Sequence, residues 1–119
     1  ADYNRPETLK KYLLETSDWA DGKINRFYSC PEYLEHVAPC ITKGAAVSFL
    51  CDYTGIPICN TIAAGDAEND ISMLEAAHTG CAMKNADEKV KRAADYITEN
   101  DNNHDGVAEI IQKFVLIKP

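Results

Sequence analysis

The sequence has no long apolar run and no surplus of positive charge. None of its apolar stretches approaches the roughly 20 residues that a membrane-spanning helix needs, and its N-terminal residues lack the basic start and apolar stretch of a signal peptide. The net charge is −7 without a basic patch to offset it, so the long-range field repels nucleic acids and anionic membranes. We therefore expect a soluble, cytoplasmic protein with neither as a partner.

The sequence also lacks paired cysteines. Its five cysteines are odd in number, and no two of them form a C-x-x-C motif. They lie mostly within apolar segments, which is typical of buried, reduced thiols rather than of a disulfide framework. We expect neither a disulfide nor a zinc site from these residues, which are Cys30, Cys40, Cys51, Cys59 and Cys81.

Size and composition suit a folded globular protein. The 119 residues, of which 45% are hydrophobic, are enough for one compact domain, and this is the default expectation. Because the overall charge is negative, any anionic small molecule, such as a phosphorylated one, would have to be attracted locally, by a metal ion or by a suitably placed lysine.

The first part of the chain favours one helix and two strands. Asn4 can cap a helix with Glu7 shortly after it, and apolar residues then fall on one face as far as Ser17. Aromatic and branched residues predict short strands over residues 23–29 and 33–37, with a Cys-Pro pair between them.

From Thr42 onward, predicted helices and strands alternate. A core helix begins near Thr42 and stops at Gly55, and its apolar residues recur at helical spacing. These residues are Ala46, Phe49, Leu50 and Tyr53. Further strands are predicted at 60–64, 80–83 and 96–98, and further helices at 69–77, 86–93 and 106–115. This order is typical of an α/β fold in which helices cover both faces of a parallel sheet.

The segment before the last helix has two interpretations. Residues 101–106 match the opening of a calcium-binding EF-hand loop, but Gln112 stands where a bidentate glutamate is needed. We favour a turn in which Asp105 caps the last helix. The apolar stripe of that helix is Val107, Ile110, Ile111 and Phe114.

The run from Gly65 to Asp70 is the most informative segment. In open parallel sheets, ligands bind at the carboxyl ends of the strands, and Asp66 follows directly on a predicted strand. Asn69 and Asp70 fall in the first turn of the next helix, so three oxygen-bearing side chains can converge there. Such a cluster suits a hard cation such as Mg²⁺. A helix cap with a favourable first-turn charge explains the same residues equally well.

Lys43 stands directly before Gly44 at the start of the first core helix. A lysine there lies against the positive end of the helix dipole, which is mildly unfavourable, so its position hints at an anionic partner. A solvated surface lysine is the alternative and the commoner explanation.

Taken in order, these segments resemble a known family. The similarity lies in T-K-G at 42–44, A-G-D-A-E-N-D-I-S-M-L at 64–74, A-M-K-N-A at 82–86 and D-G-V at 105–107. Together they are similar to the C-terminal half of the Cof-type phosphatases of the haloacid dehalogenase superfamily. The resemblance runs from about Tyr33 to Phe114. It implies a Rossmann-type, doubly wound parallel sheet and a magnesium-dependent phosphomonoesterase that acts on a sugar phosphate or similar small metabolite.

The resemblance also implies roles for individual residues. Lys43 matches the lysine that neutralises the phosphoryl group and the nucleophile, and Asn69 matches the amide that helps to hold phosphate. Asp66 matches the magnesium ligand, and Asp70 the acidic residue that supports the metal shell and orients the lysine. These roles suit a phosphoryl transition state, because fixed cations and donors stabilise its spread negative charge. Asn85 lies near the site by the same resemblance, or else forms a turn.

One motif of the family has no counterpart here. The family attacks phosphate with an aspartate of an N-terminal D-x-D-x-T/V motif, and no two aspartates of this chain are separated by a single residue. The resemblance therefore implies a C-terminal fragment. In it, residues 1–30 are the remnant of an α+β cap domain of type II, and residues 31–119 are the C-terminal half of the core. We expect this chain alone to be inactive and to bind Mg²⁺ weakly.

The absence of the N-terminal half of the core predicts an interface on this chain. By resemblance, the nucleophile strand lies beside the strand at 60–64, so its absence leaves an unpaired edge. We expect a homo-oligomer, or binding of the N-terminal half, through this edge. A catalytically dead interaction or regulatory module is the alternative function, and a D-x-D motif encoded about 150 residues upstream would argue against it. The order of Lys43 before the Asp66 loop disfavours a phosphate acceptor of receiver type.

Overall fold

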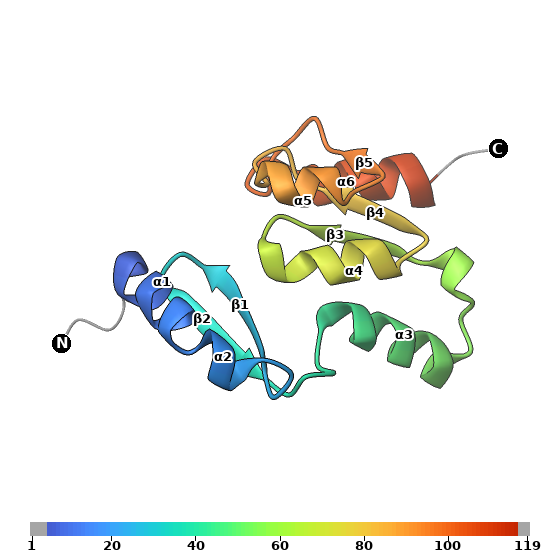
Figure 1. Cartoon of the computed structure of the whole chain (residues 1–119). Helices are drawn as coiled ribbons and strands as arrows, with labels where there is room; N and C mark the ends of the chain where they lie inside the picture. The colour runs from blue at the N-terminus through green and yellow to red at the C-terminus, as the bar shows by residue number, and fades with distance from the viewer. Residues whose placement is uncertain (1–4, 117–119) are drawn as a thin grey trace. The chain divides into compact units, whose positions relative to one another are not determined.

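The chain forms two compact units in a computed structural model that describes residues 5–116 (Figure 1). The first unit comprises Ala1–Ile41 and the second Thr42–Pro119. The sequence predicted a boundary between residues 30 and 31. The structure divides the chain later, because the strand at Tyr33–Val37 pairs with the strand before it and so belongs to the first unit.

The first unit consists of a helical segment and a β-hairpin. Helix α1 spans Pro6–Glu15 and begins with a proline, whose fixed φ suits a first helical turn, and the short helix α2 spans Ser17–Ala20. Strands β1 (Asn25–Cys30) and β2 (Tyr33–Val37) pair antiparallel. The predicted helix and strands are therefore confirmed, whereas the proposed cap Asn4 lies outside the described residues.

Side chains of the hairpin contact the helical segment. Arg26 donates from Nη1 to Thr16 Oγ1 at 2.7 Å and to the carbonyl oxygen of Leu13 at 3.4 Å. The ring of Tyr12 meets the ring of His36 edge-on, with 5.8 Å between centroids. These contacts tie α1 to both strands of the hairpin.

A three-stranded parallel sheet organises the second unit. Its strands stand in the order β3 (Ile62–Gly65), β4 (Thr79–Ala82) and β5 (Tyr96–Ile97). The register aligns the last residues of the three strands, so their carboxyl ends lie at one edge. The predicted α/β fold with a parallel sheet is confirmed.

Helical segments alternate with these strands. Thr42 caps α3 by accepting a hydrogen bond from the nitrogen of Ala45 at 3.0 Å, and the helix ends at Gly55 in the left-handed conformation, as predicted. Among residues 5–116, no helix is long and apolar enough to cross a membrane. The helical segments are α3 (Lys43–Thr54), η1 (Ile58–Asn60), η2 (Glu68–Asp70), α4 (Ile71–Ala76), α5 (Glu88–Arg92), α6 (Gly106–Ile110) and the π-helical turn η3 (Ile111–Val115).

Apolar side chains pack on both faces of the sheet. Along β4 successive side chains alternate between the faces. Ala82 joins Leu74 and Val90 in a cluster with α4 and α5, whereas Cys81 packs with Ile110 of α6. Helices thus cover both faces, as the alternation of elements predicted.

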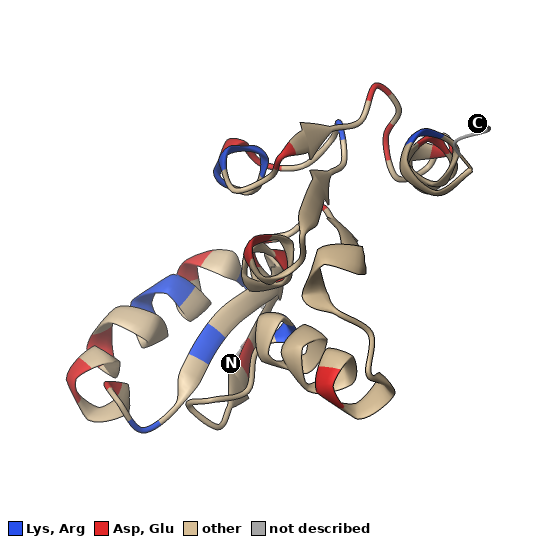
Figure 2. Cartoon of the chain, turned by 90° about the vertical axis from the view of Figure 1, so that its right-hand side faces the viewer, with Lys and Arg blue, Asp and Glu red and all other residues tan. Residues whose placement is uncertain are grey.

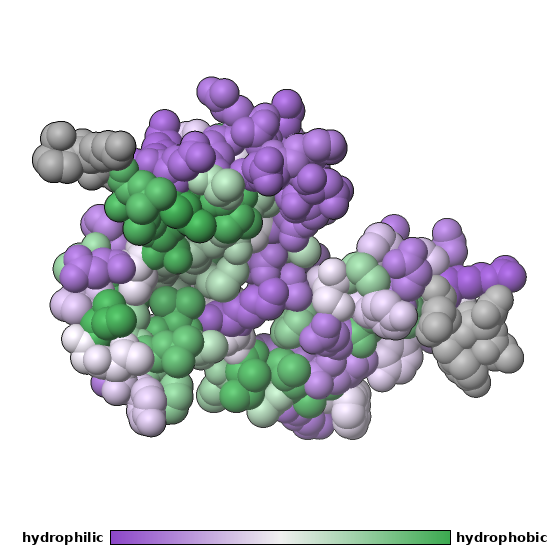
Figure 3. All heavy atoms as spheres, turned by 180° about the vertical axis from the view of Figure 1, so that it is seen from behind, coloured by the Kyte–Doolittle hydropathy of each residue, from purple (hydrophilic) through white to green (hydrophobic). Residues whose placement is uncertain are grey.

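The predicted inner faces of two helices are nevertheless exposed. In α3, Phe49 is 66% exposed, Leu50 54% and Tyr53 80%. In the last helical segment, Val107 and Ile111 are also exposed. Figure 3 shows apolar side chains gathered on the surface of the second unit. Helical spacing therefore identified the helices, but the residues that would cover these faces are not among those described.

Two expectations about single residues are wrong. Asp105 does not cap α6 through its side chain. Its φ is 62°, and this left-handed turn lets the nitrogen of Gly106 donate to the carbonyl of Asp101 at 3.0 Å. Of the five cysteines only Cys81 is buried, because it alone lies in the central strand of the parallel sheet.

Candidate active site

The loop after β3 is held in place by a carboxylate of its own. Asp70 Oδ2 accepts hydrogen bonds from the backbone nitrogens of Asp66 at 3.0 Å and Ala67 at 3.1 Å. The Asp70 side chain passes so close to Gly65 that a Cβ there would collide with it. The G-D-x-x-N-D spacing therefore folds into a tight loop that holds Asp66 at the carboxyl edge of the sheet.

Helix α3 brings Lys43 to the same loop. The Lys43 ammonium forms an ion pair with Asp70 Oδ1. Gly44 permits this approach, because a Cβ there would collide with the carbonyl of Ser72, and the nitrogen of Gly44 donates to Ser72 Oγ at 3.1 Å. Lys43 is the single basic residue of α3 and stands at its first position. Figure 2 shows how basic and acidic residues are distributed along the helices and strands. Its side chain remains 47% exposed, so an anion can reach it.

The surroundings of Asp70 favour its ionised form. Burial raises the pKa of Asp70, but the hydrogen bonds from Lys43 and from the backbone of Ala67 and Asp66 outweigh burial and hold the pKa below its usual value. Asp70 is 5% exposed. A buried, ionised carboxylate thus holds the lysine ammonium beside the loop.

Two side-chain oxygen atoms at the loop have no hydrogen-bond donor among the described residues. Asp66 Oδ2 accepts from Asn102 Nδ2 at 2.8 Å, whereas no described residue donates to Oδ1. Asn69 has a buried Oδ1 without a hydrogen-bond partner among the described residues. Buried polar atoms without partners are costly and often mark a ligand. Hard oxygen atoms of this kind are what Mg²⁺ prefers, so the residues fit that ion.

The described residues do not form a complete metal site of their own. Within residues 5–116, no group of three or more His, Cys, Asp or Glu side chains could hold a metal ion. Mg²⁺ commonly keeps several waters and binds through one or two carboxylates together with substrate phosphate. Other oxygen ligands would therefore have to complete the shell around Asp66.

The structure brings the predicted site residues together and adds one. Lys43 contacts Asp70, and Asp66, Asn69 and Asp70 share one loop. Sequence reasoning missed Asn102, since residues 101–106 suggested only a turn or a calcium loop. Asn102 and Asp66 are 36 positions apart, and no local spacing pattern connects them.

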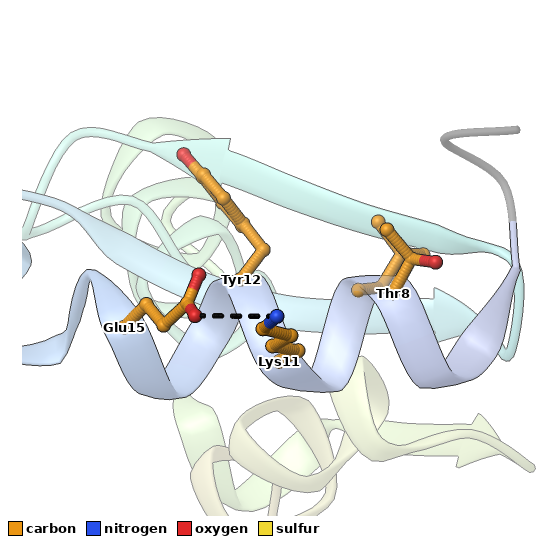
Figure 4. Close-up of a pocket in the computed structure, with 5 residues that line it drawn as sticks. Thr8, Lys11, Tyr12 and Glu15 are labelled. Atoms are coloured by element: carbon orange, nitrogen blue, oxygen red, sulfur yellow. Dashed lines mark ion pairs between the residues drawn. The ribbon is translucent and has the colours of Figure 1, made fainter. Parts of the chain in front are cut away.

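A groove of about 460 Å³ along α1 is a separate concave feature (Figure 4). It is lined by Thr8, Leu9, Lys11, Tyr12 and Glu15. Lys11 and Glu15 neutralise each other across 3.7 Å, and both are well exposed. The charges that line the groove are already paired with each other, so the loop after β3 is the better candidate.

Known proteins resemble both the sequence and the structure. Residues 2–111 match the haloacid dehalogenase-like hydrolase family. The chain is 43% identical to the 5-amino-6-(5-phospho-D-ribitylamino)uracil phosphatase of Bacillus subtilis, over 74% of this chain and 35% of that protein. A solved haloacid dehalogenase-like hydrolase of Bacteroides thetaiotaomicron is 44% identical with a TM-score of 0.72, over 90% of this chain and 40% of that one. A solved sugar phosphatase of subclass IIB is 30% identical with a TM-score of 0.79, over 97% and 42%.

Two conclusions follow from these similarities. The chain spans less than half the length of these relatives, so it corresponds to only part of each. The family match covers most of the chain, and the solved structures share its fold. The chain belongs to the haloacid dehalogenase superfamily, among its Cof-type hydrolases.

Proposed function

We propose that a polypeptide containing this chain is a magnesium-dependent phosphomonoesterase that hydrolyses a sugar phosphate or a similar small metabolite. The observation that carries the proposal is the Lys43–Asp70 pair, held against the Asp66 loop at the carboxyl edge of a parallel sheet. The names of two relatives support the substrate class, since one is a sugar phosphatase and the other a phosphatase of a phosphoribityl compound.

Each site residue has a part in this proposal. The half-exposed ammonium of Lys43 would neutralise phosphate oxygens, and Asn69 would help to hold the phosphate. Asp66 would bind Mg²⁺, while Asp70 would support the metal shell by fixing the loop and orienting Lys43. When bound, Mg²⁺ supplies positive charge that stabilises the phosphoryl oxygens.

The nucleophile would come from another segment. No D-x-D motif occurs in this chain, and the relatives are more than twice its length. We propose that the attacking aspartate belongs to a segment that corresponds to the part of the relatives not covered by this chain. The chain alone would then be inactive. The helices and hairpin of the first unit would then be the remnant of a cap domain.

Hydrolysis of p-nitrophenyl phosphate by a polypeptide that carries the D-x-D motif ahead of this chain tests the proposal. Asp66→Ala and Lys43→Ala should each lower kcat/KM by at least about a hundredfold, the scale of losing a key electrostatic stabiliser. Lys11→Ala, which removes an exposed ammonium paired with Glu15, is the control and should leave the rate unchanged. No hydrolysis by the unmodified polypeptide would favour a catalytically dead interaction module instead, and equal rates for all three variants would contradict the roles assigned to Asp66 and Lys43.

A further inference from the structure

The segment between β5 and α6 is anchored by one carboxylate. Glu109 accepts hydrogen bonds from the Tyr96 hydroxyl at 2.6 Å, the nitrogen of Glu99 at 2.9 Å and the nitrogen of Asn100 at 3.0 Å. The hydrogen bond to Glu109 raises the pKa of Tyr96 to about 12 and lowers the pKa of Glu109. Glu109 therefore holds the start of the segment against α6.

A second set of contacts fixes the same segment to the end of β4. The Thr98 hydroxyl, which is 2% exposed, donates to the carbonyl of Asn100 at 2.5 Å and accepts from the nitrogen of Lys84 at 3.0 Å. At the other end of the segment, a Cβ on Gly106 would come within 2.8 Å of the carbonyl of Asp101. The path of this segment is thus strongly constrained.

Asn102 lies at the tip of this segment and contacts two other strand ends. Its backbone nitrogen donates to Asn85 Oδ1 at 3.0 Å, beyond the end of β4. Its side-chain Nδ2 donates to Asp66 Oδ2 at 2.8 Å, beyond the end of β3. Asn102 therefore connects the carboxyl ends of all three strands of the described sheet.

We infer that Asn102 is a positioning residue that holds Asp66 Oδ2 so that Oδ1 faces the metal ion, an inference that rests on the proposed function. A carboxylate that is already oriented loses less rotational freedom when it binds a cation. A neutral amide suits this role, because it donates a hydrogen bond without competing with the cation for the carboxylate's charge.

Binding of Mn²⁺, used as a paramagnetic probe in place of Mg²⁺, tests the inference in this chain. Titrations followed by broadening of backbone amide signals should show that Asn102→Ala weakens Mn²⁺ binding about tenfold, the scale of losing an outer-shell partner. Asn103→Ala is the matched control, since Asn103 is an exposed neighbour in the same turn. Its Mn²⁺ affinity should equal that of the unmodified chain.

A metal-free readout separates positioning from a general loss of structure. In the metal-free Asp66→Ala variant, the NMR signals of the Asn102 side-chain amide should shift, whereas those of Asn103 should not. If Asn102→Ala unfolds at a lower temperature than Asn103→Ala, its weaker Mn²⁺ binding could reflect lost structure. In that case the shift of the Asn102 amide signals is the deciding result, and an unchanged signal overturns the inference.

The Asp66→Ala variant separates a failure of the proposed metal site from a failure of the role inferred for Asn102. Unchanged Mn²⁺ binding by Asp66→Ala, or no Mn²⁺ response in the unmodified chain even at the high Mn²⁺ concentrations that weak binding needs, contradicts the proposed metal site and the inference with it. If Asp66→Ala loses binding while Asn102→Ala binds as tightly as Asn103→Ala, only the inference on Asn102 is overturned.

Discussion

The carboxyl edge of the sheet in the second unit is closed by hydrogen bonds, whereas the outer side of β3 is open. At the carboxyl edge, Lys43 pairs with Asp70, and Asn102 donates to Asp66. Along β3, no described strand pairs with the side away from β4, and Ile62 is 38% exposed. The contacts that hold the Asp66 loop and Lys43 therefore come from within this chain, but the apolar surfaces beside them are only partly covered.

The difference indicates which surfaces a further polypeptide segment would cover. Burying a large apolar side chain contributes about 1.5–3 kcal/mol, and an open strand edge readily pairs with another chain. The exposed face of α3 and the free edge of β3 both lack such cover among the described residues. We propose that a segment carrying the nucleophile strand docks along the free edge of β3. In the isolated chain, a second copy of the chain would occupy the same edge.

The largest expected effect concerns the assembly state of the isolated chain. Size-exclusion chromatography with light scattering should give a mass above the 13.2 kDa of the monomer. Ile62→Lys introduces a charge at the open edge and should return the chain to a monomer. Ile97→Lys, exposed on the opposite edge strand β5, is the matched control and should leave the assembly intact.

A stable monomer would contradict the proposed interface. The decisive combination is a folded chain of monomer mass in which the backbone amides of residues 60–64 exchange freely with solvent. Intact mass spectrometry of the same sample would show whether another polypeptide remains bound.

A smaller effect is expected from the buried charge at the closed edge. Asp70→Asn should lower the free energy of unfolding by about 2 kcal/mol, because hydrogen bonds to a charged group are lost. Asp52→Asn, at an exposed position of α3, should change it by less than about 0.5 kcal/mol. Urea unfolding monitored by circular dichroism measures both. Equal stabilities of the two variants would show that the Lys43–Asp70 pair does not hold the site together.

The pH dependence of stability sharpens the same comparison. The pKa of Asp70 is lower in the folded chain than its ordinary value of 3.8, so its stabilising contribution is present above that value. The contribution is lost as the pH falls through the folded-state pKa. The unmodified chain and Asp70→Asn should therefore converge in stability below about pH 4, whereas a constant difference down to pH 2 would contradict the lowered pKa.

Local patterns predicted the elements of the fold and the loop of the site. The helix from Thr42 to Gly55 has a capping side chain at its start and a left-handed glycine at its end, and both are visible in the sequence. The Gly65–Asp70 run likewise encodes its own hydrogen bonds within a few residues. Patterns of this kind depend only on neighbouring positions, so they can be recognised in the sequence without knowledge of the whole fold.

Features that depend on distant residues were not predictable in the same way. Helical spacing marked Phe49 and Tyr53 as one face, but it could not tell whether anything covers that face. The Asn102–Asp66 hydrogen bond joins the loops after β5 and β3, and only the strand order brings those loops together. The left-handed conformation of Asp105, which replaced the expected cap, is a different case, because the Gly106–Asp101 hydrogen bond that accompanies it is local.

Reconstitution of phosphatase activity tests the central claim most directly. Hydrolysis of p-nitrophenyl phosphate with Mg²⁺ would be measured for this chain, for a separate polypeptide that carries the D-x-D-x-T/V motif and the preceding half of the core, and for their mixture. We expect no activity from either alone, and Mg²⁺-dependent activity from the mixture that disappears with Asp66→Ala. Robust hydrolysis by this chain alone, abolished by Asp66→Ala or Lys43→Ala, would contradict the claim that the nucleophile comes from another segment.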